Sequence, residues 1–161
     1  MLIALVGAIT STDSGVSFPS GVYQLGARTI VVDSVYGVRT WKYVYNAEAA
    51  TAYAAGTVVM NQTATATPGR TLVAATSVSA HRIEGVAQHA IPAQSWGWIL
   101  AEGLGLVIAD TGGFTVDTGL IPGNAVAGTA DDASATGAIF ALALATTLAT
   151  ASGVCKIRCA L

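Results

Sequence analysis

Residues 39–46 read Arg-Thr-Trp-Lys-Tyr-Val-Tyr-Asn and give the clearest structural signal in the chain. Their three aromatic residues occupy every second position. This is the period of a half-buried β-strand, because successive side chains of a strand point to opposite faces. The stretch Arg28 to Val35 is rich in β-branched and apolar residues, and only a turn signal at Tyr36 and Gly37 separates it from this segment. Together the two stretches predict a β-hairpin.

Short segments of the same kind recur along the chain between turns rich in glycine and proline. Gly103 and Gly105 interrupt one of them and predict a break between two strands. Glu48 to Ala55 fits either one short helix or a loop. Many short strands at regular spacing predict an all-β fold, a small β-barrel or β-sandwich of antiparallel strands. The further predicted strands are Val22 to Leu25, Thr57 to Asn61, Thr71 to Ala75, Arg82 to Gln88, Trp96 to Glu102, Leu106 to Ala109 and Ala125 to Thr129.

The C-terminal part of the chain gives two conflicting signals. Gly137 to Ala151 is rich in Ala and Leu, and intrinsic propensity favours a helix there. Large apolar residues nevertheless alternate with alanines between residues 140 and 145, which is a strand period. We therefore predict a closing hairpin made of Ile139 to Ala145 and Val154 to Leu161.

The two cysteines, Cys155 and Cys159, lie in the last predicted strand. Positions four apart in a strand share a face and lie roughly 13 Å apart. A disulfide needs Cα atoms within about 7 Å, so the two cannot bridge each other. We predict two free, buried thiols, which fits a protein made in a reducing cytoplasm.

The composition indicates a chain that associates with other subunits. Its 161 residues fit one domain, and we assign residues 1–24 to an N-terminal extended arm and linker and residues 25–161 to a single β domain. Charged residues make up 10% of the chain and hydrophobic residues 53%. A surface so poor in charge is explained if much of it lies against other subunits, so we expect a homo-oligomer. A compact, weakly charged monomer is the alternative.

Charge and hydropathy argue against two classes of partner. The formal net charge is −2, and the seven basic residues are scattered along the chain. Nucleic acid is not an expected partner, because binding to phosphate backbones needs clustered basic residues. The longest apolar run, Met1 to Ile9, is about half the length that a membrane-spanning helix needs. We therefore expect no membrane partner.

No residue pattern predicts catalysis, a cofactor or a metal site. His81 and His89, with Glu84 between them, do not match the spacing of a metalloprotease. If both lay on one strand, they would share a face but lie too far apart to bind one ion. Asp131 and Asp132 could form a metal site, but such pairs in Gly/Ala/Ser turns usually cap backbone donors. The expectation is a protein that is not an enzyme.

The apolar segment Met1 to Ile9 carries no charge and is followed by a polar linker, Ser11 to Ser20. An apolar strand left in water exposes unpaired backbone groups and invites pairing with another chain. The segment either adds to a neighbouring subunit or folds back as a strand of its own domain. Its candidate subunit-contact residues are Met1, Leu2, Ile3, Leu5, Val6 and Ile9.

Four motifs in order carry a resemblance to a known family. They are Leu25-Gly26-Ala27-Arg28, the aromatic strand Trp41 to Tyr45, Ala55-Gly56-Thr57-Val58-Val59, and RIEGVAQHAIPAQSWGWI over Arg82 to Ile99. Over most of residues 25–161 the chain resembles a family of small tailed-phage virion proteins regarded as capsid decoration, or cement, proteins. The first 24 residues depart from the pattern. The resemblance implies a structural virion protein on the outer capsid surface that is made in the host cytoplasm and binds the major capsid protein. A trimer is expected, because capsid lattices present threefold positions.

Trp96 and Trp98 flank Gly97 in the last of these motifs. They either pack in the core or serve as exposed anchors for a neighbouring subunit, so both join the candidate subunit contacts.

Two functions remain open. One is capsid decoration, and the other is a head-fibre or tail-associated binding module that contacts a host receptor or glycan. The loops Gln62 to Ser79 and Gly128 to Gly137 lack the aromatic residues that such recognition normally needs, which favours decoration.

Overall fold

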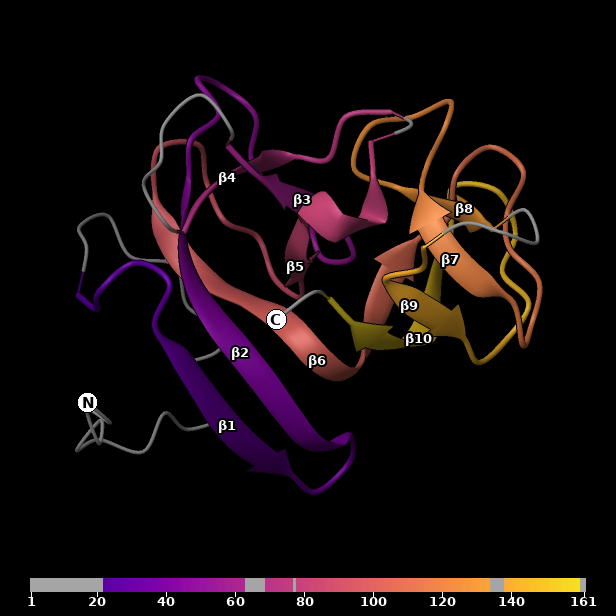
Figure 1. Ribbon diagram of the computed structural model, residues 1–161, viewed down its shortest axis with the longest axis horizontal. Helices are drawn as coiled ribbons and strands as arrows, with labels where there is room; N and C mark the ends of the chain where they lie inside the picture. The colour runs from indigo at the N-terminus through magenta and orange to yellow at the C-terminus, as the bar shows by residue number, and fades with distance from the viewer. Residues whose placement is uncertain (1–21, 63–68, 77, 134–137, 160–161) are drawn as a thin grey trace.

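The computed structural model describes residues 22–62, 69–76, 78–133 and 138–159. In these residues the chain forms ten β-strands, one 3₁₀ turn and no α-helix, so the all-β prediction is confirmed (Figure 1). No helix in this part of the chain is long and apolar enough to cross a membrane. The elements are β1 (Arg28–Asp33), β2 (Gly37–Asn46), β3 (Val58–Asn61), β4 (Arg70–Val73), η2 (Ala80–Arg82), β5 (Ile83–Ala87), β6 (Trp96–Ile108), β7 (Gly119–Pro122), β8 (Ala130–Asp132), β9 (Ala141–Ala143) and β10 (Ser152–Arg158).

The strands pair in the order β1-β2-β4-β3-β5-β6-β10-β9-β7-β8. An additional pairing between β2 and β6 closes β2, β4, β3, β5 and β6 into an irregular ring. β1 extends from β2, while β10, β9, β7 and β8 follow from the second half of β6. Figure 1 shows the long, curved β6 running from the first group of strands to the second.

β1 and β2 form the predicted hairpin. Their antiparallel register ends with Asp33 opposite Gly37. The Asp33 carboxylate accepts hydrogen bonds from the backbone N–H groups of Val35 (2.8 Å) and Tyr36 (3.0 Å), which shapes the turn. Gly37 has a φ of 71°, a conformation that a residue without Cβ adopts at little cost.

β6 runs through Gly103 and Gly105 without interruption, so the predicted break between two strands is wrong. Its first half pairs with β2 and β5, and its second half pairs with β10. Gly103 has a φ of 119°, and a Cβ there would lie 2.9 Å from the Val38 carbonyl oxygen. The glycine therefore lets the strand bend at the point where it changes partners.

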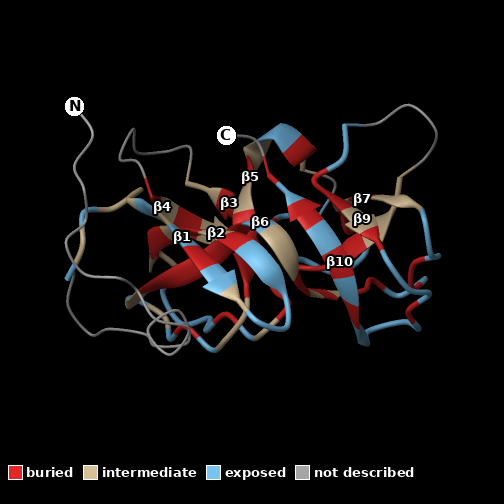
Figure 2. Ribbon diagram, turned by 90° about the horizontal axis from the view of Figure 1, so that it is seen from below, coloured by how far each residue is buried: buried red, intermediate tan, exposed pale blue. Residues whose placement is uncertain are grey.

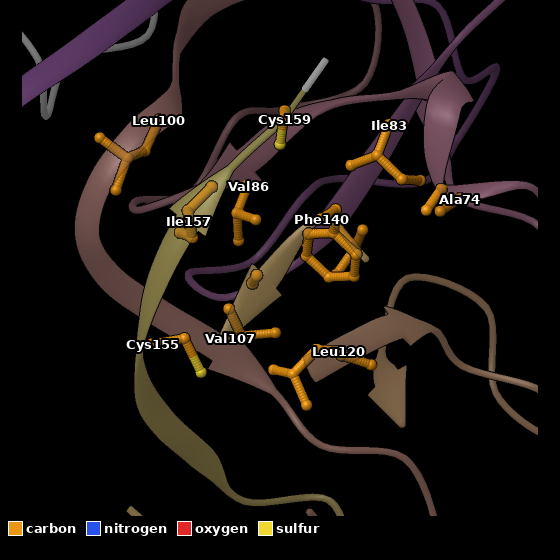
Figure 3. Packing of buried hydrophobic residues seen from close by; sticks show 14 of the residues in the cluster. Ala74, Ile83, Val86, Leu100, Val107, Leu120, Phe140, Cys155, Ile157 and Cys159 are labelled. Carbon is orange, nitrogen blue, oxygen red and sulfur yellow. The ribbon is translucent and has the colours of Figure 1, made fainter. Parts of the chain in front are cut away.

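Buried side chains form two clusters, because alternate residues of the ring strands point to opposite faces. The larger cluster joins the ring to the β7–β10 strands and includes Tyr43, Trp98 and Ile157. Figure 3 shows side chains of this cluster, among them Leu120, Phe140 and Ile157, gathered from segments distant in the sequence. The smaller cluster consists of Val44, Tyr53, Val59, Ala87, Ile91 and Ile99.

β9 and β10 pair as the predicted closing hairpin. Along β10 and just after it, Cys155, Ile157 and Cys159 are buried, whereas Lys156 and Arg158 are exposed. Both cysteines are free, as predicted. Burial raises the pKa of each thiol to about 12. The alternation in the sequence thus outweighs the helix propensity of the Ala/Leu-rich stretch before it.

The strand predicted over Ala125 to Thr129 is wrong, because these residues form a turn between β7 and β8. The Asp110 carboxylate, only 1% exposed, organises this turn. It accepts hydrogen bonds from the backbone N–H groups of Ala125 (2.8 Å) and Thr111 (2.7 Å). A carboxylate fifteen residues away from Ala125 in the sequence therefore decides the local structure.

The remaining predicted strands correspond to β3, β4, β5 and the two halves of β6. Val22 to Leu25 forms no strand and leads into β1 through a turn, with Tyr23 packed against the larger core cluster. Residues 48–55 form a loop, the second of the two alternatives. Tyr53 anchors that loop through an isolated bridge to Ile91.

Candidate subunit-contact surface

The outward side of the β1–β2 hairpin carries a group of exposed apolar side chains. Ile30 and Val32 on β1 are 68% and 79% exposed, Val38 on β2 is 63% exposed and Val35 in the turn is 76% exposed. Val32 and Val38 stand directly opposite each other. We call these four residues the hairpin face. In Figure 2 the exposed residues of β1 lie at the border of the sheet.

The hairpin face is exposed because β1 is apolar on both of its sides. Val31 points inward, is 6% exposed and belongs to the larger core cluster. Its neighbours Ile30 and Val32 must then point outward, because side chains alternate along a strand. Exposed apolar side chains that gather on neighbouring strands are candidates for a contact with another protein.

A partly buried ion pair on the opposite side links β1 to β2 next to the turn. Nη2 of Arg39 lies 2.8 Å from Oδ2 of Asp33, and the guanidinium lies 4.9 Å from the ring centres of both Tyr36 and Trp41. The backbone N–H groups of Tyr36 and Val35, helped by Arg39, lower the pKa of Asp33. Because the turn is already ordered, docking at the hairpin face costs little conformational entropy.

β1 is also an edge of the sheet. Its one strand partner among the described residues is β2. An edge strand presents unpaired backbone N–H and C=O groups, and soluble proteins commonly protect such edges with charged residues or proline. β1 has charged residues only at its ends, Arg28 and Asp33, and none between them. Within the described residues, the edge therefore lacks the usual protection against pairing with another chain.

The structure separates the predicted subunit-contact residues into three groups. The arm residues Met1, Leu2, Ile3, Leu5, Val6 and Ile9 lie outside the described residues. Trp98 is 0% exposed and packs 5.1 Å from the Tyr43 ring, so it is a core residue. Trp96 is partly buried against the Tyr45 ring at 4.7 Å, which leaves only part of it available to a neighbour.

The sequence pattern predicts a strand at Ile30 and Val32 but does not mark them as contact residues. Residues 30–32 are three consecutive β-branched apolar residues, so neither side of the strand carries a polar residue there. Such a strand is either covered on both sides or exposes one apolar side. Which of these holds depends on the edge position of β1, and the sequence does not contain that information.

A cleft of about 640 Å³ opens beside β9 and β10. Its lining includes His81, Lys156 and Arg158 above apolar residues such as Ile139 and Phe140. Its described lining contains no carboxylate and no second histidine. In the described part of the chain, no group of three or more His, Cys, Asp or Glu residues is placed to hold a metal ion. The lining also includes Cys159, a buried thiol whose pKa is raised to about 12 by burial.

Asp132 acts as a structural cap. It lies in β8 and accepts hydrogen bonds from the Thr118 hydroxyl (2.6 Å) and the Thr115 backbone N–H (3.0 Å). Burial on its own would raise the pKa of Asp132, but these hydrogen bonds lower it. The carboxylate thereby fixes the loop between β6 and β7, which agrees with the capping interpretation of the acidic pair.

Comparisons with known proteins give a likeness of fold. No family model matches the chain, and no curated protein matches it by sequence. Among solved structures, the chain is similar to the head fiber gp8.5 N base in bacteriophage phi29, with a TM-score of 0.52 and 14% sequence identity. The similarity covers 75% of this chain and 96% of the phage chain.

Proposed function

We propose that the chain is a structural subunit of a tailed-phage virion, attached to the capsid by protein–protein contacts and without a catalytic role. The observation that carries the proposal is the fold shared with the head fiber base over 96% of that chain. The sequence motifs that resemble those of capsid decoration proteins support the same setting. The low proportion of charged residues, 10%, suits a subunit whose surface is largely covered by others.

In the first form of this function, the chain decorates the capsid. A homotrimer sits on the outer capsid surface and joins neighbouring copies of the major capsid protein against the pressure of the packaged DNA. The hairpin face supplies apolar side chains for these contacts, on a turn that Asp33 and Arg39 hold in place. Desolvation of apolar side chains is the main favourable term in such contacts.

The second form is the base of a head fibre, and the likeness to the phi29 fiber base favours it specifically. A base binds the capsid in the same manner but carries a projecting part instead of reinforcing the shell. Neither form needs a receptor-binding loop, which fits the lack of aromatic residues in Gln62 to Ser79 and Gly128 to Gly137.

The experiment adds purified chain to capsids that lack it, followed by sedimentation and quantification of the bound copies by mass spectrometry. Saturable binding at a fixed ratio to the major capsid protein is expected. Decoration raises the temperature at which filled particles release DNA, whereas a fibre base leaves it unchanged. A chain that stays in the supernatant, and is absent from purified virions, contradicts the proposal.

A pair of variants tests the contact surface in the same assay. Val35→Lys places a charge in the hairpin face and is expected to weaken capsid binding at least tenfold. Leu148→Lys is the matched control, since Leu148 is 80% exposed but lies far along the chain between β9 and β10. Equal binding by both variants removes the hairpin face from the capsid contact.

A further inference from the structure

We infer that the free edge of β1 receives the segment Met1 to Ile9 of a neighbouring copy as an added strand. The inference deepens the proposed function, because it requires copies of the chain to lie side by side. The contact between two subunits then has two parts. β1 of one copy accepts the added strand, and Met1 to Ile9 of the next copy, which lies outside the described residues, supplies it.

The edge of β1 can accept a further strand through its backbone groups and its apolar side chains. Half of the N–H and C=O groups of an edge strand point away from its partner and can form a second ladder. Beside this free edge stand Ile30 and Val32, with Val38 next to them on β2. An incoming strand would thus gain backbone hydrogen bonds together with apolar contacts on the outward side.

The donor has matching chemistry. Met1 to Ile9 contains no charged residue and no proline, and it is rich in Leu, Ile and Val. Nine residues span roughly 30 Å as a strand, which exceeds the roughly 20 Å of the six-residue β1. The segment can therefore pair along the whole edge, and its apolar side chains can lie beside Ile30 and Val32 and leave their outward ends accessible.

The length of the connection favours a neighbouring copy over the same chain. Eighteen residues, Thr10 to Ala27, separate the segment from β1, whereas a hairpin loop needs only about two to five. The described part of this connection is already engaged, since Val22 N–H bonds the Tyr43 hydroxyl and Tyr23 packs on Trp98. The twelve residues from Thr10 to Gly21 reach up to roughly 40 Å when extended, enough to cross to an adjacent subunit.

The test mixes variants that each carry one added cysteine, so that only a bond between chains is detected. Chains with Leu5→Cys or Val6→Cys are mixed with size-tagged chains carrying Ile30→Cys and oxidised with diamide. The native thiols are buried and do not interfere. A mixed disulfide dimer is expected with at least one arm position. Leu148→Cys is the matched control acceptor, equally exposed but not at the β1 edge, and it is expected to give at most one tenth of that yield.

A second measurement uses no cysteine. Val32→Lys, or deletion of residues 1–16, is expected to lower the oligomer mass in light scattering and to leave the melting temperature within about 4 °C of the wild type. Leu148→Lys is expected to retain the wild-type mass. If the mixed dimer is absent, or if a disulfide forms only within one chain carrying both cysteines, the inference is wrong.

The outcome can be separated from that of the proposed function. The cross-link is measured on purified protein, so it is expected whether or not capsids bind the chain. Conversely, if the mixed dimer does not form but the wild-type chain still saturates capsids at a fixed copy number, the strand addition is overturned and the capsid role stays intact. A truncation that unfolds the isolated chain shows that the segment belongs to its own domain, which also overturns the inference.

Discussion

β1 and β10 are strands of similar length with opposite outward chemistry. Both alternate strictly, and both send β-branched or sulfur-containing side chains inward. The outward row of β10 carries Lys156 and Arg158, whereas that of β1 carries Ile30 and Val32. β10 lies between β6 and β9, while β1 pairs on one side only among the described strands. An interior strand of the sheet thus has a charged, solvated outward row, and an edge strand has an apolar outward row suited to contact.

The strongest change is expected in the reaction rates of thiols, because a cysteine on the inward side of a strand is buried and one on the outward side is exposed. Raising a thiol pKa from 9.0 to about 12 lowers its thiolate fraction by about a thousandfold near neutral pH. Cys155 and Cys159 are therefore expected to react with a disulfide reagent at least a thousandfold more slowly in the folded chain than in urea. Val32→Cys, on the outward row of β1, serves as the control and is expected to react at the rate of a free thiol. Rapid labelling of both native cysteines in the folded protein would contradict the buried placement.

The next effect compares two isoleucines in the same kind of strand. Ile157 is 0% exposed in the larger core cluster, and Ile30 is 68% exposed. Ile157→Ala is expected to lower the free energy of unfolding by about 2–5 kcal/mol, because it removes buried methyl groups and leaves a cavity. Ile30→Ala is expected to change it by less than about 0.5 kcal/mol. Urea unfolding of the two variants measures both values, and similar losses would mean that β1 is covered on its outward side within one chain.

Asp110 gives a third test, of a turn rather than a strand. Burial alone would raise the pKa of Asp110, but backbone N–H groups, chiefly those of Ala125 and Thr111, lower it. Asp110→Asn is expected to cost about 2 kcal/mol at pH 7, because a charged acceptor is lost and buried N–H groups lose their partner. The folded-state pKa lies below that of the unfolded chain, so the contribution is complete above about pH 4 and is lost as the pH falls further.

The pH series supplies its own control. Unfolding of the wild type and of Asp110→Asn is followed from pH 7 down to pH 2. The gap between their unfolding free energies is expected to narrow below about pH 4. A gap that stays constant over this range would show that the carboxylate charge is not what holds the turn at Ala125.

Sequence patterns predicted the parts of the fold that depend on local periodicity. The β1–β2 hairpin and β10 followed from alternation, and β10 also placed Cys155 and Cys159 on one buried side. Alternation suffices there, because one side of each strand faces a core whatever the partners are. The parts that depend on distant partners could not be predicted. Gly103 allows a bend only because β6 changes from β2 to β10 at that point.

The sequence predicted that the chain makes subunit contacts, but it did not predict which residues form the candidate surface. Low charge content indicated subunit contacts, and the tryptophans were the natural candidates because large aromatic residues anchor interfaces. Trp98 lies in the core beside Tyr43, which is the first of the two alternatives that its sequence position left open. The exposed residues turned out to be Ile30 and Val32, whose side chains resemble those of any core strand. Their exposure follows from strand order, which pairing across the whole chain determines.

The smallest expected effect comes from giving β10 the outward row of β1. In the double variant Lys156→Ile and Arg158→Val the outward side becomes apolar, but the backbone groups of β10 stay paired with β6 and β9. Arg158 stands opposite Glu102, so its loss costs a few tenths of a kcal/mol, which better strand propensity partly offsets. The melting temperature is expected to stay within about 4 °C of the wild type.

The mass in light scattering is also expected to stay that of the wild type. An apolar row on a strand whose backbone groups are already paired leaves no N–H or C=O groups for an incoming strand to bond. A higher mass for this variant would show that apolar side chains alone drive association, and the free edge of β1 would then lose its special role.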